Sequence, residues 1–263
     1  MFDYEFMRNA FVAAALVAIV AGCTGYFLVL RAQTFAGHAL AHVGFAGATG
    51  AVLLGISPLW GMLLVTAGGG AGMGLLGERL EGRDVAIGIV LALSLGLGLL
   101  FLHFYTSYAA QATALLFGNL LAVDRATIVL LAALTAVSLL ALAVLSRPLL
   151  FATLQPELAE AKGVSLRTIS VLFLLIVAIV TAECAQIVGV LLVFGLMVAP
   201  AAAAQRLTRR LQWGLLASML LALMDAWVGL VLAYYTDWPS SFWIVALGAL
   251  TYLCAALAFP DRS

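Results

Sequence analysis

The sequence has little charge, few cysteines and no cluster of basic residues. Only 9% of its 263 residues are charged, whereas a soluble domain carries roughly 25%, so the charges are too few to cover a water-facing surface. Net charge is zero and no lysine- or arginine-rich tract is present, which excludes a nucleic-acid partner. The three cysteines lie in apolar runs and form no CxxC pair, so we interpret them as small packing residues.

Apolar residues make up 65% of the chain and fall in long runs. A bilayer core about 30 Å thick needs roughly 20 apolar residues as a helix, and the sequence offers that length repeatedly. We predict an all-α transmembrane bundle of about eight or nine spans, forming a single domain over residues 1–263. The first run is too long, and its leader too acidic, for a cleavable signal peptide. The candidate spans are 10–30, 39–56, 59–77, 85–104, 126–146, 168–184, 187–205, 211–235 and 241–259.

A tenth apolar patch, 112–123, is only about twelve residues long and is interrupted by Gly118-Asn119. That length favours a re-entrant or surface helix over a full span.

The basic residues predict an orientation for these spans. If the segment 147–167 is cytoplasmic and nine spans alternate, ten of the twelve basic residues lie inside, and only Arg8 and Arg125 lie outside. This distribution satisfies the positive-inside rule, and it places the N-terminus outside and the C-terminus in the cytoplasm of a cell membrane. The ten inside are Arg31, Arg79, Arg83, Arg147, Lys162, Arg167, Arg206, Arg209, Arg210 and Arg262.

The loops between spans are too short to hold a catalytic domain, so we expect a transporter subunit rather than an enzyme. Its energy must come from another chain or from an ion gradient. The pattern Gly72-x-Gly74-x-x-Gly77 matches a dinucleotide fingerprint only as text, because that motif requires a preceding strand and a following helix. Abundant glycine in the spans instead indicates close helix packing.

Two histidines, His38 and His42, are spaced four residues apart and therefore share one face of a helix. This spacing suits a common metal ion. A zincin protease has the same spacing but needs Glu directly after the first histidine, and position 39 is Ala. The alternative is that the imidazoles form hydrogen bonds between helices. Ionisable groups at membrane depth are costly and usually functional, which favours the metal interpretation.

Four other ionisable residues fall in or near the spans, and each leaves alternatives open. Asp237, at an expected outer helix end, belongs to the ion path or is merely solvated. Asp225 lies in mid-span and is interpreted as satisfying a neighbouring helix. Glu183 is either a ligand or a solvated residue at an outer end, and His103 is interpreted as an interfacial residue.

The segment from Arg147 to Gly163 predicts a short cytoplasmic helix. Pro148 is expected to end the preceding span, Pro156 to occupy the first turn, and Gly163 to form the C-cap. Acidic residues Glu157 and Glu160 and the later Lys162 match the helix dipole. Such a segment is either an ordinary loop helix or a rigid lever that a motor protein can push.

Together these segments resemble the membrane permeases of ABC importers for zinc and manganese. The resemblance runs through most of the chain, and it is clearest at Gln186–Val193 followed by Pro200–Ala204. The other matching segments are Gly25–Arg31, His38–His42, Leu116–Leu121 and Arg147–Gly163.

The resemblance implies a type II importer fold and a homodimer with one cytoplasmic ATP-binding subunit per chain. It also implies an extracytoplasmic metal-binding protein, and a divalent metal as cargo rather than a permanently bound cofactor. In this family the segment matching Gln155, Pro156, Glu157, Glu160 and Gly163 is the coupling helix that docks on the ATPase.

The family usually reads G-D-A-L-S-H at 37–42, with the acid and the histidine lining the metal path. Here His38 stands at the acid position, and His42 matches. A His/His pair favours borderline metals such as zinc, or else the cargo differs from the family norm.

Three hypotheses follow from these residues. The first is the metal permease, with His38, His42 and Asp237 along the ion path. The second is an ABC permease for a non-metal solute. The third is a proton-coupled secondary transporter, which would need no ATPase.

Overall fold

The computed structural model describes residues 4–75, 83–105, 115–118 and 120–260, and within them every regular element is helical. Each of the nine predicted spans is helical over most of its length, which confirms the all-α prediction. The long helices are α1 (Glu5–Leu30), α2 (Thr34–Leu53), α3 (Pro58–Leu75), α4 (Arg83–His103), α6 (Arg125–Leu154), α8 (Leu166–Val188), α9 (Val193–Leu207), α10 (Leu211–Thr236) and α11 (Ser240–Ala258). Two short elements, η1 (Leu120–Ala122) and α7 (Pro156–Ala161), connect them.

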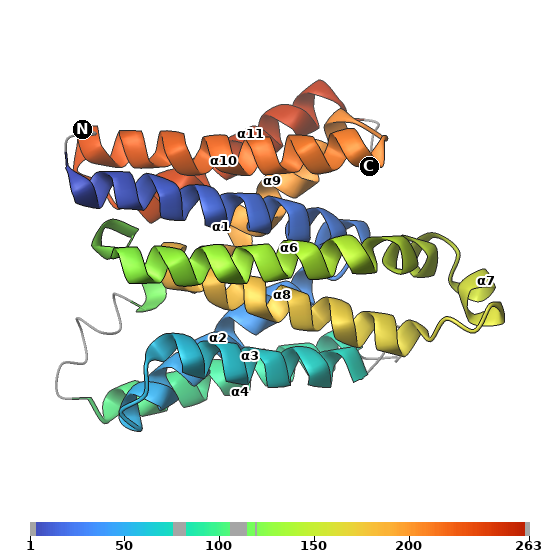
Figure 1. Ribbon diagram of the computed structural model, residues 1–263, viewed down its shortest axis with the longest axis horizontal. Coiled ribbons are helices and arrows are strands. Elements are labelled where there is room, and N and C mark those ends of the chain that lie inside the picture. Colours follow the sequence, from blue (N-terminus) through green and yellow to red (C-terminus); the bar gives the residue numbers. More distant parts are fainter. Residues whose placement is uncertain (1–3, 76–82, 106–114, 119, 261–263) are drawn as a thin grey trace.

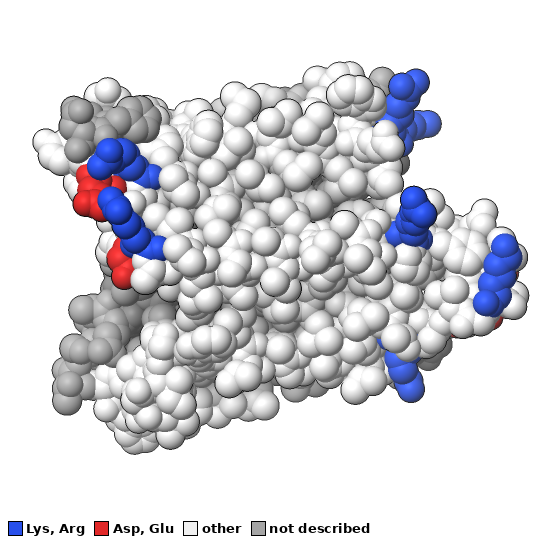
Figure 2. Space-filling model, in the orientation of Figure 1, with Lys and Arg blue, Asp and Glu red and all other residues white. Residues whose placement is uncertain are grey.

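The helices run roughly along one axis and form a bundle with two ends (Figure 1). We call the end from which α7 projects the α7 end, and the opposite end the far end. Helix α1 begins at the far end, whereas α11 finishes at the α7 end (Figure 1). On the face drawn in Figure 2, charged residues lie at the two ends and a wide middle zone has none, as a bilayer requires.

Six helices in the described part of the chain are long and apolar enough to cross a membrane, namely α1, α4, α6, α8, α10 and α11. Helices α2 and α3 contain 20 and 18 residues but are less apolar, because α2 carries two histidines and α3 carries six glycines. Helix α9 is shorter, with 15 residues.

Two predicted boundaries were wrong. The span predicted to end before Pro148 continues to Leu154, because a proline removes only one helical hydrogen bond, and membrane helices tolerate this loss. The span predicted from residue 187 begins at Val193, since α8 continues to Val188 and Gly189 interrupts the helix with a positive φ of 93°.

The patch at 112–123 is described only in part, because 112–114 and 119 lie outside the described residues. Helix α4 ends and α6 begins at the same end of the bundle, so the described part agrees with a segment that does not cross (Figure 1). Gly77, Arg79 and Arg262 also lie outside the described residues.

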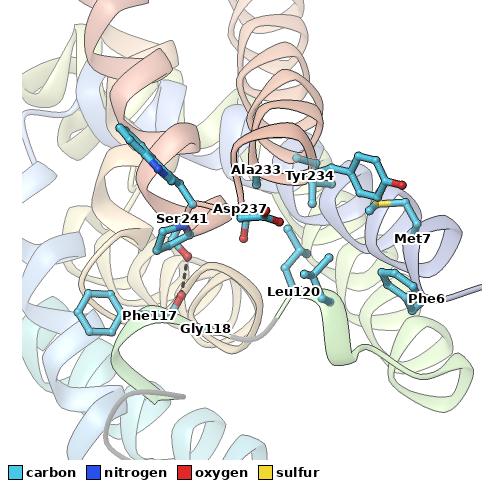
Figure 3. Close-up of a pocket in the computed structure, with 14 residues that line it drawn as sticks. Phe6, Met7, Phe117, Gly118, Leu120, Ala233, Tyr234, Asp237 and Ser241 are labelled. Atoms are coloured by element: carbon cyan, nitrogen blue, oxygen red, sulfur yellow. Dashed lines mark hydrogen bonds between the residues drawn. The ribbon is translucent and has the colours of Figure 1, made fainter. Parts of the chain in front are cut away.

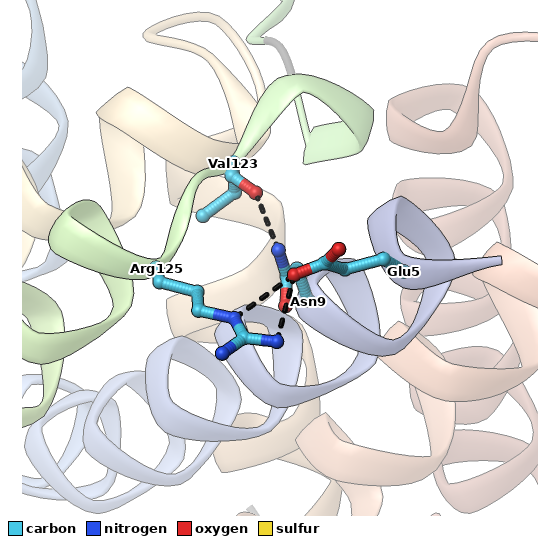
Figure 4. A network of polar contacts seen from close by, with 4 residues as sticks. All are labelled: Glu5, Asn9, Val123 and Arg125. Atoms are coloured by element: carbon cyan, nitrogen blue, oxygen red, sulfur yellow. Dashed lines mark hydrogen bonds and ion pairs between the residues drawn. The ribbon is translucent and has the colours of Figure 1, made fainter.

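Polar contacts join α1 to α6 at both ends of the bundle. At the far end, Arg125 pairs with Glu5 at 2.8 Å, and the Asn9 amide donates to the Val123 carbonyl at 3.2 Å (Figure 4). At the α7 end, the Arg31 guanidinium donates to the hydroxyls of Thr153 on α6 and Ser170 on α8, at 2.9 and 3.0 Å. These contacts fix both ends of α1, which lies in the core of the bundle.

Candidate functional site

The histidine pair lies inside the bundle on α2. The rings of His38 and His42 meet edge to face with centroids 4.9 Å apart, and His38 also meets the ring of Phe194 on α9 at 5.1 Å. His42 is buried and His38 is half-buried. Both Nδ1 atoms are buried without a hydrogen-bond partner among the described residues. These two nitrogens therefore do not bond between helices, and both remain available as metal ligands.

Small residues allow α2 to sit this deep in the bundle. A side chain at Gly37 would meet Leu28 of α1 at 2.6 Å, and one at Gly44 would meet Thr66 of α3 at 2.9 Å. Glycine at these two positions lets the helix backbones approach closely in lipid. The described residues place no third His, Cys, Asp or Glu beside the pair, so other ligands for an ion there would be water, backbone or another chain.

The interruption between α8 and α9 determines what faces His38. Gly189 ends α8, and the chain resumes as α9 at Val193, so Phe194 falls in the first turn of the new helix. The backbone N–H groups of Val190 and Leu191 donate to the carbonyls of Leu115 and Leu116 at 3.2 Å each. The segment 115–118 thereby supplies hydrogen-bond acceptors that a broken helix in a membrane would otherwise lack.

Asp237 lies elsewhere, at the far end. It ends α10 with a left-handed φ of 57° and lines an open cavity of about 750 Å³. The cavity lies between the start of α1, residues 117–118 and 120–121, and the α10–α11 turn. Figure 3 shows Asp237 between Leu120 and Ser241, whose hydroxyl donates to the Phe117 carbonyl at 2.5 Å. Neither histidine lines this cavity, so the structure separates Asp237 from the pair.

Two further carboxyl groups are buried in the bundle. Glu183 on α8 has no exposed surface, and its Oε1 accepts a hydrogen bond from the Thr135 hydroxyl of α6 at 2.5 Å. Asp225 on α10 accepts one from the Thr251 hydroxyl of α11 at 3.1 Å. Asp225 therefore bonds a neighbouring helix, as interpreted, through one oxygen, while its buried Oδ2 has no partner among the described residues. The solvated alternative for Glu183 was wrong, because α6 covers it. His103 lies exposed at the end of α4.

The predicted helix over 155–163 is present as α7. Pro156 occupies its first turn, and Gly163 adopts a positive φ of 81°. The N–H of Val164 donates to the carbonyl of Ala159, and that of Gly163 donates to Glu160, both at 2.9 Å. This pair of bonds is a Schellman cap, which ends the helix sharply.

The surface of α7 faces outward. Gln155, Glu157, Glu160 and Gly163 are exposed, as is the apolar side chain of Leu158. Helix α7 therefore presents a short, capped surface of mixed polarity beyond the bundle (Figure 1).

Sequence reasoning missed Thr135 and Ser138 on α6. They are buried and lie three residues apart, so they share one face of the helix. Two hydroxyl residues at that spacing within an apolar span predict a polar contact with a neighbouring helix.

Comparisons with known proteins agree with this architecture. A protein of Treponema pallidum named "Probable metal transport system membrane protein" is 33% identical over all of this chain and 99% of its own length. "Manganese transport system membrane protein MntC" of Halalkalibacterium halodurans is 29% identical over all of this chain and 90% of its own. In the structure titled "PsaBC from Streptococcus pneumoniae in complex with Fab", one chain superposes with a TM-score of 0.87 at 26% identity. That match covers 98% of this chain and 94% of the other.

The family profile described as "ABC 3 transport family" matches residues 3–259, which is nearly the whole chain. The chain also superposes closely on that PsaBC chain over nearly the full length of both. The chain therefore belongs to the ABC 3 transport family, whose fold is that of a type II ABC importer permease, and it is a membrane-spanning subunit rather than an ATPase.

Proposed function

We propose that this chain is the permease subunit of an ATP-driven importer for a divalent metal ion of the manganese and zinc class. Its family membership and the names of its relatives support this cargo. The short loops leave ATP hydrolysis to a separate cytoplasmic subunit.

The histidine pair is the observation that carries the proposal. Two imidazoles one helical turn apart, with both Nδ1 atoms unbonded, offer nitrogen ligands in the interior of a membrane bundle. Imidazole suits first-row divalent metals, and a polar group at this depth is retained only where it has a use. A non-metal solute would leave these nitrogens without a function.

The orientation we propose places the α7 end in the cytoplasm and the far end outside. Basic residues gather where helices meet the α7 end, at Arg31, Arg147, Lys162, Arg167 and Arg206. The far end holds Arg8 and Arg125, and Glu5 pairs with Arg125. This asymmetry follows the positive-inside rule. The N-terminus is then outside and the C-terminus inside.

In this orientation α7 is the contact with the ATPase. Its Schellman cap and the proline in its first turn make it rigid, and the exposed Gln155, Glu157 and Glu160 face a cytoplasmic partner. Closure of the ATPase pair moves α7, and α6 and α8, which flank it directly in the chain, transmit that motion. Two copies of the chain form the transporter.

The cavity at Asp237 opens on the outside, where an extracytoplasmic metal-binding protein delivers the ion. The carboxylate of Asp237, which no described basic side chain pairs with, attracts a cation into this cavity before the ion reaches the histidines. The ion is held weakly enough at each position to be released again.

The test uses the complete transporter, reconstituted in vesicles with its ATPase, and measures uptake of Mn²⁺ and Zn²⁺. We expect His42→Ala, and separately His38→Ala, to reduce uptake by at least tenfold, because losing even an outer-shell partner of a metal ligand costs about 10–100-fold in affinity or activity. His38→Asp is expected to retain uptake and to shift preference from Zn²⁺ toward Mn²⁺.

His103→Ala is the matched control, since His103 is the third histidine of the chain and lies exposed at the end of α4. It should import metal at the normal rate. Normal uptake by both alanine variants would disprove the role of the pair. ATP turnover that no divalent metal stimulates would favour a non-metal cargo, and uptake without an ATPase would indicate a secondary transporter.

A further inference from the structure

A second polar position lies between α6 and α8, away from the histidines. The carboxyl group of Glu183 is completely buried, and only one of its oxygens is bonded, by the Thr135 hydroxyl. The other oxygen, Oε2, has no partner among the described residues. A buried carboxylate without full pairing is costly, so the protein must supply this oxygen with a cation or a proton.

Two further unbonded oxygens lie one helical turn from Glu183 and from Thr135. Gln186 lies three residues after Glu183 and therefore on the same side of α8, and its buried Oε1 has no partner. On α6, Ser138 lies one turn from Thr135, and its buried hydroxyl oxygen likewise has none. Carboxylate, amide and hydroxyl oxygens are thus available, while no described basic side chain pairs with Glu183.

The end of α8 adds a favourable field for a cation. The helix stops at Val188, so Gln186 lies in its last turn and Glu183 one turn earlier. The carbonyl end of a helix carries partial negative charge, and interrupted membrane helices hold cations at such ends. The segment 115–118 lies directly over this end, because a side chain at Gly118 would collide with the backbone carbonyl of Ile187.

We propose that Glu183 and Gln186, supported by the α6 hydroxyls of Thr135 and Ser138, form a second binding position for the transported ion. Its oxygen ligands favour a hard cation such as Mn²⁺ over Zn²⁺, whereas the imidazoles favour the borderline metal. This inference rests on the proposed function and adds a basis for selectivity. An ion passing both positions must satisfy two different ligand sets.

The experiment measures Mn²⁺ bound to the intact transporter in lipid nanodiscs, by electron paramagnetic resonance titration. We expect Glu183→Gln, which keeps the shape of the side chain, to lose one bound Mn²⁺ per chain or to weaken its Kd at least about tenfold. Thr135→Val retains the carboxylate but removes its hydroxyl donor, and should weaken the same Kd less. In His38→Ala/His42→Ala, this binding position should persist.

Asp225→Asn is the matched control, because Asp225 is also a buried carboxyl bonded by one threonine but lies on α10. Its Mn²⁺ binding should equal that of the wild type. Unchanged binding in Glu183→Gln, with normal Mn²⁺ import, would overturn this inference and leave the proposed function intact. A different outcome is that Glu183→Gln loses a bound Mn²⁺ while the wild-type transporter imports no metal. That result would support the second binding position and disprove the proposed metal import. If Glu183→Gln does not fold, unchanged binding in Thr135→Val overturns the inference.

Discussion

The inner helices of this bundle, α1 and α8, are much more buried than its outer helices, α4 and α6, but they are not more apolar. Within an 18-residue apolar stretch of each helix, the buried share is 67% in α1 and 72% in α8, but only 22% in α4 and 28% in α6. Yet α4 and α6 are at least as apolar as α1 and α8. Lipid and protein interior are equally apolar surroundings, so hydropathy identifies a span without locating it in the bundle.

Backbone contacts at glycine distinguish α1 from α4. On α1, a side chain at Gly25 would collide with the backbone of Met197 on α9, whereas one at Gly96 on α4 would meet nothing within 4 Å. Glu183 lies on the inner helix α8, and His42 lies on α2, most of whose residues are also buried. Close backbone approach therefore marks the core, where the ion path is proposed, whereas a buried carboxyl also lies on a less buried helix, as Asp225 does on α10.

The strongest test of the difference between inner and outer helices replaces one glycine on α1 and one on α4. We expect Gly25→Leu to prevent the formation of a monodisperse protein, because α1 and α9 would have to separate. Overpacking a tight core costs about 1–3 kcal/mol and sometimes more, a large part of a stability of about 5–15 kcal/mol. Gly96→Leu should leave both yield and thermal unfolding in detergent unchanged. Equal behaviour of the two variants would show that α1 and α9 are not in close contact.

Much of this arrangement could be predicted from local sequence. The nine apolar runs predicted nine helices, and Pro156 with Gly163 predicted α7 and its cap. These features depend on neighbouring residues alone. The pairing of Glu183 with Thr135 spans 48 positions, and it depends on α6 and α8 lying side by side, which no local pattern specifies. The same limit applies to Asp237, whose distance from His42 depends on the packing of the whole bundle.

A smaller effect is expected at α7, which belongs to neither the inner nor the outer helices of the bundle. Gly163→Val should reduce metal-stimulated ATP turnover and uptake together, because a β-branched residue at a positive φ costs about 1–2 kcal/mol and disrupts the cap. The thermal unfolding of the bundle should change little, since α7 is exposed. Gly163→Asn is the matched variant, as asparagine tolerates this conformation and should retain most of the coupling. Full coupling in Gly163→Val would mean that the geometry of α7 is not used.

The smallest effect is expected at Asp124, at the start of the outer helix α6. Its side chain accepts a hydrogen bond from the Thr127 N–H at 2.9 Å and caps the helix. Hydrogen bonds from Thr127, from its hydroxyl first and its N–H second, lower the pKa of this carboxyl. A group with a lowered pKa stabilises the folded state above its ordinary pKa and loses that contribution as the pH falls. Asp124→Ala should therefore lower the unfolding temperature slightly at neutral pH, and the difference should shrink in acid. Asp124→Asn retains an acceptor at the cap, so its unfolding temperature should lie between those of the wild type and Asp124→Ala. A difference that grows in acid would show that Asp124 does not cap α6 as a carboxylate.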